Sequence, residues 1–217
     1  LYGQDGEVLT WRGHRVLAYD GTALNLPNTP ELQKAFSVQR NQHGSECVQA
    51  LAGVLYDVRN DIALGAQLGR RQAEKNFLLG DLWEATKPGD LIVMDRLFAD
   101  YSVIAQAEKT RRKVLIRCPK GRLTVVDQFW ESTATEQIVT LELPQSPQTR
   151  KYVRENDLST SVRVRLVKVL LETGETEVLL TTLCDRRRYP LREFKQAYHW
   201  RWGEETFYDR VKNIFEV

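Results

Sequence analysis

The chain has 217 residues, of which 42% are hydrophobic and 28% charged, a composition typical of a globular domain that buries its own core. Its formal net charge is +2, and its three widely spaced cysteines exclude a disulfide framework and a CxxC zinc site. No apolar run approaches the ~20 residues of a membrane helix, and no secretory pattern opens the chain, so we expect a cytoplasmic protein without membrane contact. The chain begins on Leu1 rather than Met, and we therefore expect a fragment.

Basic residues form three clusters along the chain. Lys109 to Arg122 holds seven Lys or Arg and no acidic residue, Arg186 to Arg188 are consecutive, and Arg163 and Arg165 alternate along a strand-like run. The alternation places the last two on one face of a strand. Such clusters suit a polyanion such as nucleic acid, although each alone is also compatible with a solvated surface.

Hydrophobic periodicity predicts alternating strands and helices over residues 1–121. The predicted strands are 14–19, 47–58, 62–68, 91–94 and 113–118. The second and third of these strands form a hairpin. The predicted helices are 71–86 and a helix that Asp100 caps and that runs to Thr110. This order favours a mixed sheet with helices on its faces, an α/β fold.

Residues 122–185 differ in composition, because Thr, Val, Gln, Glu and Ser dominate and two β-like runs, 161–171 and 177–183, flank a turn. We interpret them as a β-rich insertion between a first part of the core, 1–121, and a last part, 186–217. Pro190 opens a helix that is predicted to reach about residue 214. Gly203 costs this helix ~1 kcal/mol relative to Ala.

Two aspartates follow predicted buried strands. Asp20 ends the run RVLAYD, and Asp95 ends LIVMD. Ligands of α/β sheets gather at the carboxyl ends of the strands, so both residues are candidates for a shared site. Each aspartate alone is also explained as the start of a turn or the cap of a helix.

A third acidic residue lies on the predicted C-terminal helix. Tyr198, Arg201, Glu205, Tyr208 and Lys212 are three or four residues apart, so they form one polar stripe. The alternative is that Arg201 and Glu205 form an ordinary exposed ion pair worth ~0.2 to 0.5 kcal/mol, while apolar residues of the helix pack on the core.

The array Tyr198-x2-Arg201-x3-Glu205-x6-Lys212 resembles the signature of insertion-sequence transposases of the Asp-Asp-Glu class, in the insertion-sequence-four branch. The resemblance continues, in the family's order, at Asp20-Gly21-Thr22, Leu26-Pro27, the Arg40 to Gly44 loop and Asp95-Arg96-Leu97-Phe98. It implies a ribonuclease-H-like mixed sheet flanked by helices, with a β-rich insertion before the last acidic helix.

By this resemblance, Asp20, Asp95 and Glu205 are the catalytic residues and the ligands of two metal ions. Three converging carboxylates repel one another unless cations compensate their charge. Oxygen ligands without His or Cys favour Mg²⁺ or Mn²⁺. On this hypothesis Asp20 bridges both ions, which activate the attacking oxygen and stabilise the leaving one, and the other two carboxylates each complete one coordination shell.

The resemblance also implies that Tyr198, Arg201 and Lys212 bind phosphates of the transposon end. The implied partners are double-stranded DNA, as transposon ends and target, and a second copy of the chain in a homodimer, in the bacterial cytoplasm at the nucleoid. Trp130 is either a stacking partner for an unpaired base or an ordinary packing residue. Because few residues precede Asp20, we do not expect this chain to contain the family's amino-terminal DNA-recognition region.

These residues predict a transposase catalytic domain that performs metal-dependent DNA strand cleavage and strand transfer. Two alternatives stay open. One is an inactive or truncated transposase remnant that binds DNA without cutting it. The other is a related nuclease of the ribonuclease-H fold, which hydrolyses DNA but does not join it.

Overall fold

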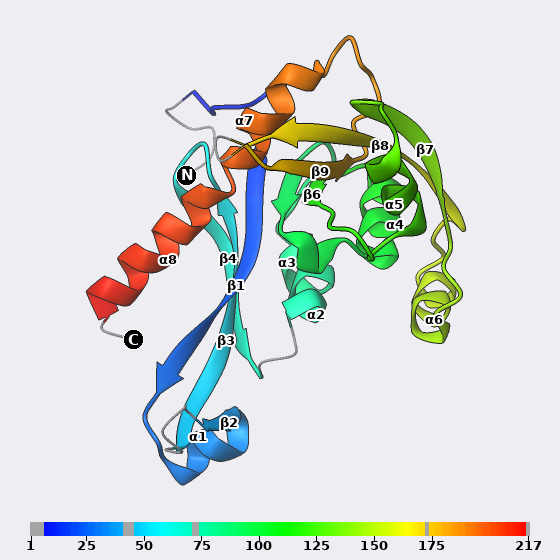
Figure 1. The fold of residues 1–217 in the computed structure, drawn as a ribbon. Coiled ribbons are helices and arrows are strands. Elements are labelled where there is room, and N and C mark those ends of the chain that lie inside the picture. Colours follow the sequence, from blue (N-terminus) through cyan, green and yellow to red (C-terminus); the bar gives the residue numbers. More distant parts are fainter. Residues whose placement is uncertain (1–6, 41–45, 71–73, 172–173, 216–217) are drawn as a thin grey trace.

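The computed structural model describes residues 7–40, 46–70, 74–171 and 174–215 (Figure 1). Their strands are β1 (Val16–Leu26), β2 (Ser37–Arg40), β3 (Glu46–Asp57), β4 (Ile62–Gly69), β5 (Leu91–Met94), β6 (Lys113–Arg117), β7 (Glu136–Glu142), β8 (Ser161–Leu170) and β9 (Thr176–Thr181). These nine strands form one sheet in the order β2-β3-β1-β5-β6-β9-β8-β7, and β4 pairs with β3. The predicted α/β class with a mixed sheet and flanking helices is confirmed. None of the described helices is both long and apolar enough to cross a bilayer.

The centre of the sheet combines parallel and antiparallel pairs. β1 pairs in parallel with β5, which pairs in parallel with β6, whereas β3 lies antiparallel to β1 and forms the predicted hairpin with β4. The apolar run of β5 is fully buried, as expected for a strand with neighbours on both sides and covered faces.

β1 is longer than predicted. It continues past Asp20 to Leu26, so the prediction that Asp20 ends the strand is wrong. The parallel pairing with β5 nevertheless stops at Tyr19 and Met94, while the antiparallel pairing with β3 continues to Leu26. Beyond Asp20, β1 and β3 project from the core as an arm that carries α1 (Pro30–Ala35) and β2 at its end (Figure 1). Residues 41–45 of the loop in the family resemblance lie outside the described residues.

One face of the central strands packs against α2 (Glu74–Leu79), α3 (Asp81–Glu84) and α4 (Tyr101–Lys109). The helix predicted at 71–86 is two short helices, because Gly80 adopts a non-helical conformation with φ −99° and ψ −125°; residues 71–73 lie outside the described part. Asp100 caps α4 by accepting a hydrogen bond from Ser102 N at 2.9 Å, as predicted. The other face packs against the C-terminal helices.

Residues 122–185 contain both helices and strands. β8 and β9 confirm the two predicted runs, and β9 pairs with β6, so these strands extend the central sheet. Two helices, α5 (Thr124–Glu131) and α6 (Pro147–Glu155), were not predicted, because we interpreted the polar and β-branched composition as mainly β. Trp130 is partly buried against the core, which favours its interpretation as a packing residue.

The expectation of an exposed basic face on β8 is wrong for Arg165. Its residue is 1% exposed, its guanidinium forms an ion pair with Glu136 of β7, and Nη1 donates to the carbonyl of Tyr189 at 2.7 Å. Arg163, two residues away, is exposed. Arg165 therefore links the outer strands to the segment that precedes the C-terminal helices.

The predicted helix from Pro190 to about residue 214 is broken. It consists of η2 (Leu191–Glu193), α7 (Phe194–His199) and α8 (Trp202–Phe215). Hydrogen bonds from residue i to residue i−3 tighten the connection, since Arg201 N donates to Tyr198 O and Glu204 N donates to Arg201 O. The break falls within the predicted polar stripe, so its members do not share one regular helix.

Candidate active site

Asp20 and Asp95 lie at equivalent positions on neighbouring strands. The last parallel pair of β1 and β5 is Tyr19 with Met94, and each aspartate is the next residue. Tyr19 and Met94 belong to the cluster beneath α2–α4. Because side chains alternate along extended backbone, the two aspartates face the opposite side of the sheet, where α7 and α8 pack.

α8 is attached to β1 through polar side chains. The Tyr208 hydroxyl donates to the carbonyl of Asp20 at 2.8 Å and accepts from Val54 N at 3.1 Å, so it connects β1 with β3. The Glu204 carboxylate accepts from the backbone N–H of Asp20 at 3.0 Å. One turn beyond Tyr208, Lys212 Nζ donates to Thr22 Oγ1 at 2.7 Å. These bonds hold α8 beside Asp20 and the following residues of β1.

Arg201 joins two of the predicted catalytic carboxylates. Its guanidinium lies 3.4 Å from Asp20 Oδ2 and 2.8 Å from Glu205 Oε1. Arg201 is 7% exposed, so the alternative of an ordinary exposed pair with Glu205 does not describe it. The guanidinium brings the acidic residue of α8 to the acidic residue of β1, although 185 positions separate them in the sequence.

Burial raises the pKa of the Asp20 carboxyl. The negative charges of Asp95 and Glu205 raise it further, while the N–H of Gly21 and the guanidinium of Arg201 act in the opposite direction. The charges of the other two predicted catalytic carboxylates therefore both reach the Asp20 carboxyl.

Tyr198 is buried beside Arg201. The Arg201 guanidinium carbon lies 5.9 Å from the centre of the Tyr198 ring. Burial raises the pKa of Tyr198 to about 12, and the charge of Asp95 acts in the same direction. Tyr198 thus contacts Arg201, while Lys212 contacts Thr22 at the start of the arm.

The structure fits a divalent metal in its donor chemistry but does not display a closed ligand set. In the part of the chain that the structure describes, no three or more His, Cys, Asp or Glu side chains are grouped so that they could hold one ion. The three carboxylates offer hard oxygen atoms, which suit Mg²⁺ or Mn²⁺. Arg201 at present supplies positive charge to two of them.

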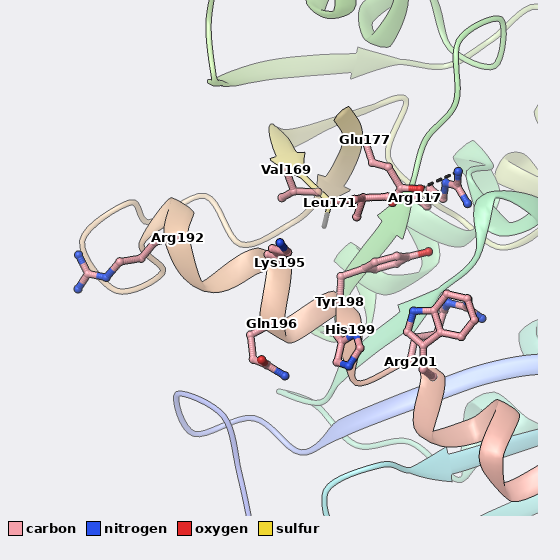
Figure 2. A pocket seen from close by; sticks show the side chains of 11 residues that line it. Arg117, Val169, Leu171, Glu177, Arg192, Lys195, Gln196, Tyr198, His199 and Arg201 are labelled. Atoms are coloured by element: carbon pink, nitrogen blue, oxygen red, sulfur yellow. Dashed lines mark ion pairs between the residues drawn. The ribbon is translucent and has the colours of Figure 1, made fainter. Parts of the chain in front are cut away.

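A pocket of about 560 Å³ opens beside Tyr198 and Arg201 (Figure 2). Its lining comes from β6, the ends of β8 and β9, and the C-terminal helices, and consists of Arg117, Val169, Leu171, Glu177, Arg192, Lys195, Gln196, Tyr198, His199, Arg201 and Trp202. Arg117 and Glu177 form an ion pair at 2.6 Å. Arg192 and Lys195 give the pocket a basic character. Arg117 belongs to the basic cluster Lys109 to Arg122 that the sequence predicted.

Glu204 was not among the site residues predicted from the sequence. Its side chain is completely buried, and burial together with the charge of Asp20 raises the pKa of its carboxyl well above the usual range. The signature gives weight to its neighbour Glu205 and none to Glu204. The signal available in the sequence was that a second glutamate, Glu204, directly precedes the signature residue Glu205.

The mixed sheet has an aspartate on β1, a second aspartate directly after the parallel strand β5, and a glutamate on the C-terminal helix that packs beside β1, the order of residues expected of an Asp-Asp-Glu enzyme domain. The chain matches the family described as transposase DDE domain over residues 11–217, and it belongs to this family. The predicted resemblance is therefore confirmed. The family is one of polynucleotidyl transferases, and its members use divalent metal ions.

The chain is also similar to an individual curated protein of the insertion-sequence-four type. The chain is 26% identical over 209 residues to "Transposase InsG for insertion sequence element IS4" of Escherichia coli strain K12. The aligned part covers 95% of this chain and 46% of that protein, so the chain spans about half the length of its relative. The relationship agrees with the insertion-sequence-four branch that the signature indicates.

Proposed function

We propose that this chain is the catalytic domain of a transposase that cleaves DNA strands and transfers them to a target with the help of divalent metal ions. The observation that carries the proposal is the arrangement of the predicted residues around Asp20. Asp95 directly follows β5, the parallel neighbour of β1, and Arg201 forms ion pairs with both Asp20 and Glu205. Membership of the transposase family supports the reaction class.

The strand order supports a ribonuclease-H-like core. β4, β3, β1, β5 and β6 are neighbours in that order, with three antiparallel strands first in the chain and two parallel strands after helices. We assign 1–121 and 186–217 to this core and 122–185 to the insertion. Because β9 pairs with β6, the insertion would extend the core sheet at its edge.

Asp20, Asp95 and Glu205 are the proposed ligands of two Mg²⁺ or Mn²⁺ ions. When bound, the ions would activate the attacking oxygen and stabilise the leaving oxygen of a displacement at phosphorus. Asp20 is the proposed shared ligand, because the charges of both other carboxylates act on its carboxyl group. Arg201, released from two carboxylates whose charge is then balanced, would be available for a phosphate group.

Tyr198, Arg201 and Lys212 are the proposed contacts to the transposon end. The basic pocket beside Tyr198 and Arg201 supports a path for the DNA backbone across α7. The Thr22 hydroxyl holds the Lys212 ammonium next to β1, on the same side as Glu205. Double-stranded DNA is the proposed substrate, a second copy of the chain brings the two ends together, and the bacterial nucleoid is the proposed location.

One assay tests the function and separates the alternatives. The protein is incubated with supercoiled DNA that carries the element's ends, with Mg²⁺ or Mn²⁺, beside Asp95→Asn and the control Glu155→Gln. Glu155 is an exposed acidic residue of α6 that pairs with Lys151. We expect nicking and joining that Asp95→Asn abolishes and the control retains. Binding without nicking would support an inactive remnant, and nicking without joining a related nuclease.

A further inference from the structure

Two side chains of α8 hold the main chain of Asp20. Glu204 Oε1 accepts its N–H at 3.0 Å, and the Tyr208 hydroxyl donates to its C=O at 2.8 Å. Glu204 and Tyr208 are four residues apart, so they lie one above the other on the same face of the helix. Both backbone polar groups of this one residue are thus bound by one helix.

β1 needs such support at this point. Its parallel neighbour ends at the residue before Asp20. On the other side, the next cross-strand pair is Gly21 with Gly53, which has no side chains to pack. Backbone with one neighbour strand and a glycine pair has more conformational freedom than the core of the sheet. α8 supplies the missing constraint.

Glu204 is an unusual residue for its surroundings. It is 0% exposed, and its second carboxyl oxygen, Oε2, has no hydrogen-bond partner among the described residues. A buried carboxyl group with one oxygen unpartnered is costly, and a leucine of similar size would avoid that cost. Departures of this kind from ordinary core packing are expected at functional sites.

We propose that Glu204 is a positioning residue, which fixes the backbone of Asp20 through its N–H so that the Asp20 carboxylate faces Asp95 and Glu205. The inference rests on the proposed function of these three carboxylates. Glu204 itself would not touch the DNA or the reacting atoms, since its side chain is enclosed and engaged with β1. Successive helical residues point about 100° apart, so Glu205 faces Arg201 instead.

Three substitutions separate the roles of the two neighbouring glutamates. Glu204→Leu fills the site but removes the acceptor for the N–H of Asp20. Glu204→Gln keeps an oxygen that can accept the same N–H. Glu205→Gln removes a proposed metal ligand and leaves the positioning bond in place. Tyr208→Phe, which loses the bond to the Asp20 carbonyl, is a second test should Glu204→Leu not fold.

The substitutions are compared in the 217-residue chain by three measurements. These are single-turnover DNA cleavage, Mn²⁺ binding in electron paramagnetic resonance titrations, and DNA binding without metal. Glu204→Leu is expected to slow cleavage and to weaken Mn²⁺ binding by about 10- to 100-fold, as for groups that orient metal ligands. DNA binding without metal stays unchanged. Glu204→Gln restores most of both losses, whereas Glu205→Gln does not cleave.

Hydrogen exchange at the Asp20 amide gives a readout that is independent of cleavage. Glu204→Leu should speed this exchange relative to the amide of Leu17, which lies in the paired part of β1. If the wild type never cleaves DNA, the proposed function is rejected. If Glu204→Leu nevertheless speeds exchange at the Asp20 amide, the positioning hydrogen bond is retained. Unchanged exchange and unchanged Mn²⁺ affinity in Glu204→Leu would overturn the positioning role, as would a Glu204→Gln variant as inactive as Glu205→Gln.

Discussion

Two parts of the sheet, its centre and its β7–β8 edge, are covered by helices in different ways. At the centre, Glu204, Tyr208 and Lys212 hold α8 to β1 and β3 by hydrogen bonds, and the ring of Phe207 stacks on Tyr56. At the edge, α5 and α6 contribute buried Val and Phe side chains to the main core. Hydrogen bonds fix atoms in position with more directionality than apolar packing does. The difference marks the centre as the part of the sheet at which precise placement of side chains matters.

Each of these two parts also contains a buried arginine, and the partners of the two arginines differ. Arg165 pairs with Glu136 and the carbonyl of Tyr189, none of which the signature includes. Arg201 pairs with Asp20 and Glu205, which the signature does include, and it borders a pocket. The first arginine connects parts of the fold, whereas the second balances charge between carboxylates that we propose to bind metal.

The largest expected effect comes from Asp95→Asn. Cleavage should fall by about three orders of magnitude or more, because a proposed metal ligand loses its charge. Stability should change little, since the half-buried Asp95 caps η1 (Arg96–Phe98) and asparagine is an equally good cap. Single-turnover cleavage and thermal unfolding measure the two quantities. A large drop in melting temperature would show that Asp95 is a structural residue, and the contrast between the centre and the edge of the sheet would fail.

The next prediction concerns the β7–β8 edge of the sheet, where a substitution should change stability and not cleavage. Arg165→Met should cost about 3 kcal/mol of unfolding free energy, because it leaves a largely buried carboxylate without its main partner. Glu136 retains Arg186 at 3.2 Å, which keeps the cost at the lower end of the range for buried pairs. Urea unfolding measures the loss. The cleavage rate per folded molecule should equal that of wild type, and a slower rate would connect this arginine to the active site.

The sequence predicted the central strands and the place of the two aspartates because short apolar runs that end in Asp are a strong local pattern. It did not predict the extension of β1 beyond Asp20, since that part of the strand is held by β3 and α8 rather than by its own periodicity. Likewise, α5 and α6 depend on local features that composition obscures, such as the Ser146 cap of α6.

The orientation of α8 was the main difficulty. The alternative interpretation of this helix let its apolar residues pack on the core, yet Trp202 is 51% exposed and Glu204 is buried. The break at Trp200 and Arg201 changes the phase of the helix, and hydrogen bonds to the backbone of β1 then select its inner face. Such tertiary bonds leave no periodic trace in the sequence. Helical spacing placed Arg201 and Glu205 on one polar stripe, and the fixed spacing of the signature, carried by a family resemblance, selected them as candidate site residues.

A smaller effect tests whether the pocket lies on the DNA path. Lys195 is exposed at its edge, so Lys195→Gln should leave stability unchanged and should reduce the slope of log affinity against log salt by about 0.9, the contribution of one phosphate contact. Lys151→Gln on α6 is the control and should leave the slope as it is. DNA binding across a series of salt concentrations gives both slopes. Equal slopes for wild type and Lys195→Gln would exclude a phosphate contact at this residue.

The smallest expected effect is a pH dependence of stability from His14. Its ring contacts the carbonyl of Gly89 through Nδ1 and the hydroxyl of Tyr189 through Nε2, an arrangement that neutral imidazole satisfies by donating to the former and accepting from the latter. Burial lowers the pKa of His14 below the value of 6.5 expected for the unfolded chain. The unfolded state therefore binds more protons, and the free energy of unfolding should fall as the pH drops below about 6.5.

Asp20 and Glu204 act in the opposite direction, since their raised pKa values make the folded state bind more protons as the pH falls. The contribution of His14 is therefore the difference between wild type and His14→Gln, measured by urea unfolding at pH 7.5 and 5.5. Wild type should lose more stability than the variant over this interval. Equal losses would show that His14 binds protons equally well in the folded and unfolded states, and the buried contacts with Gly89 and Tyr189 would then not select the neutral ring.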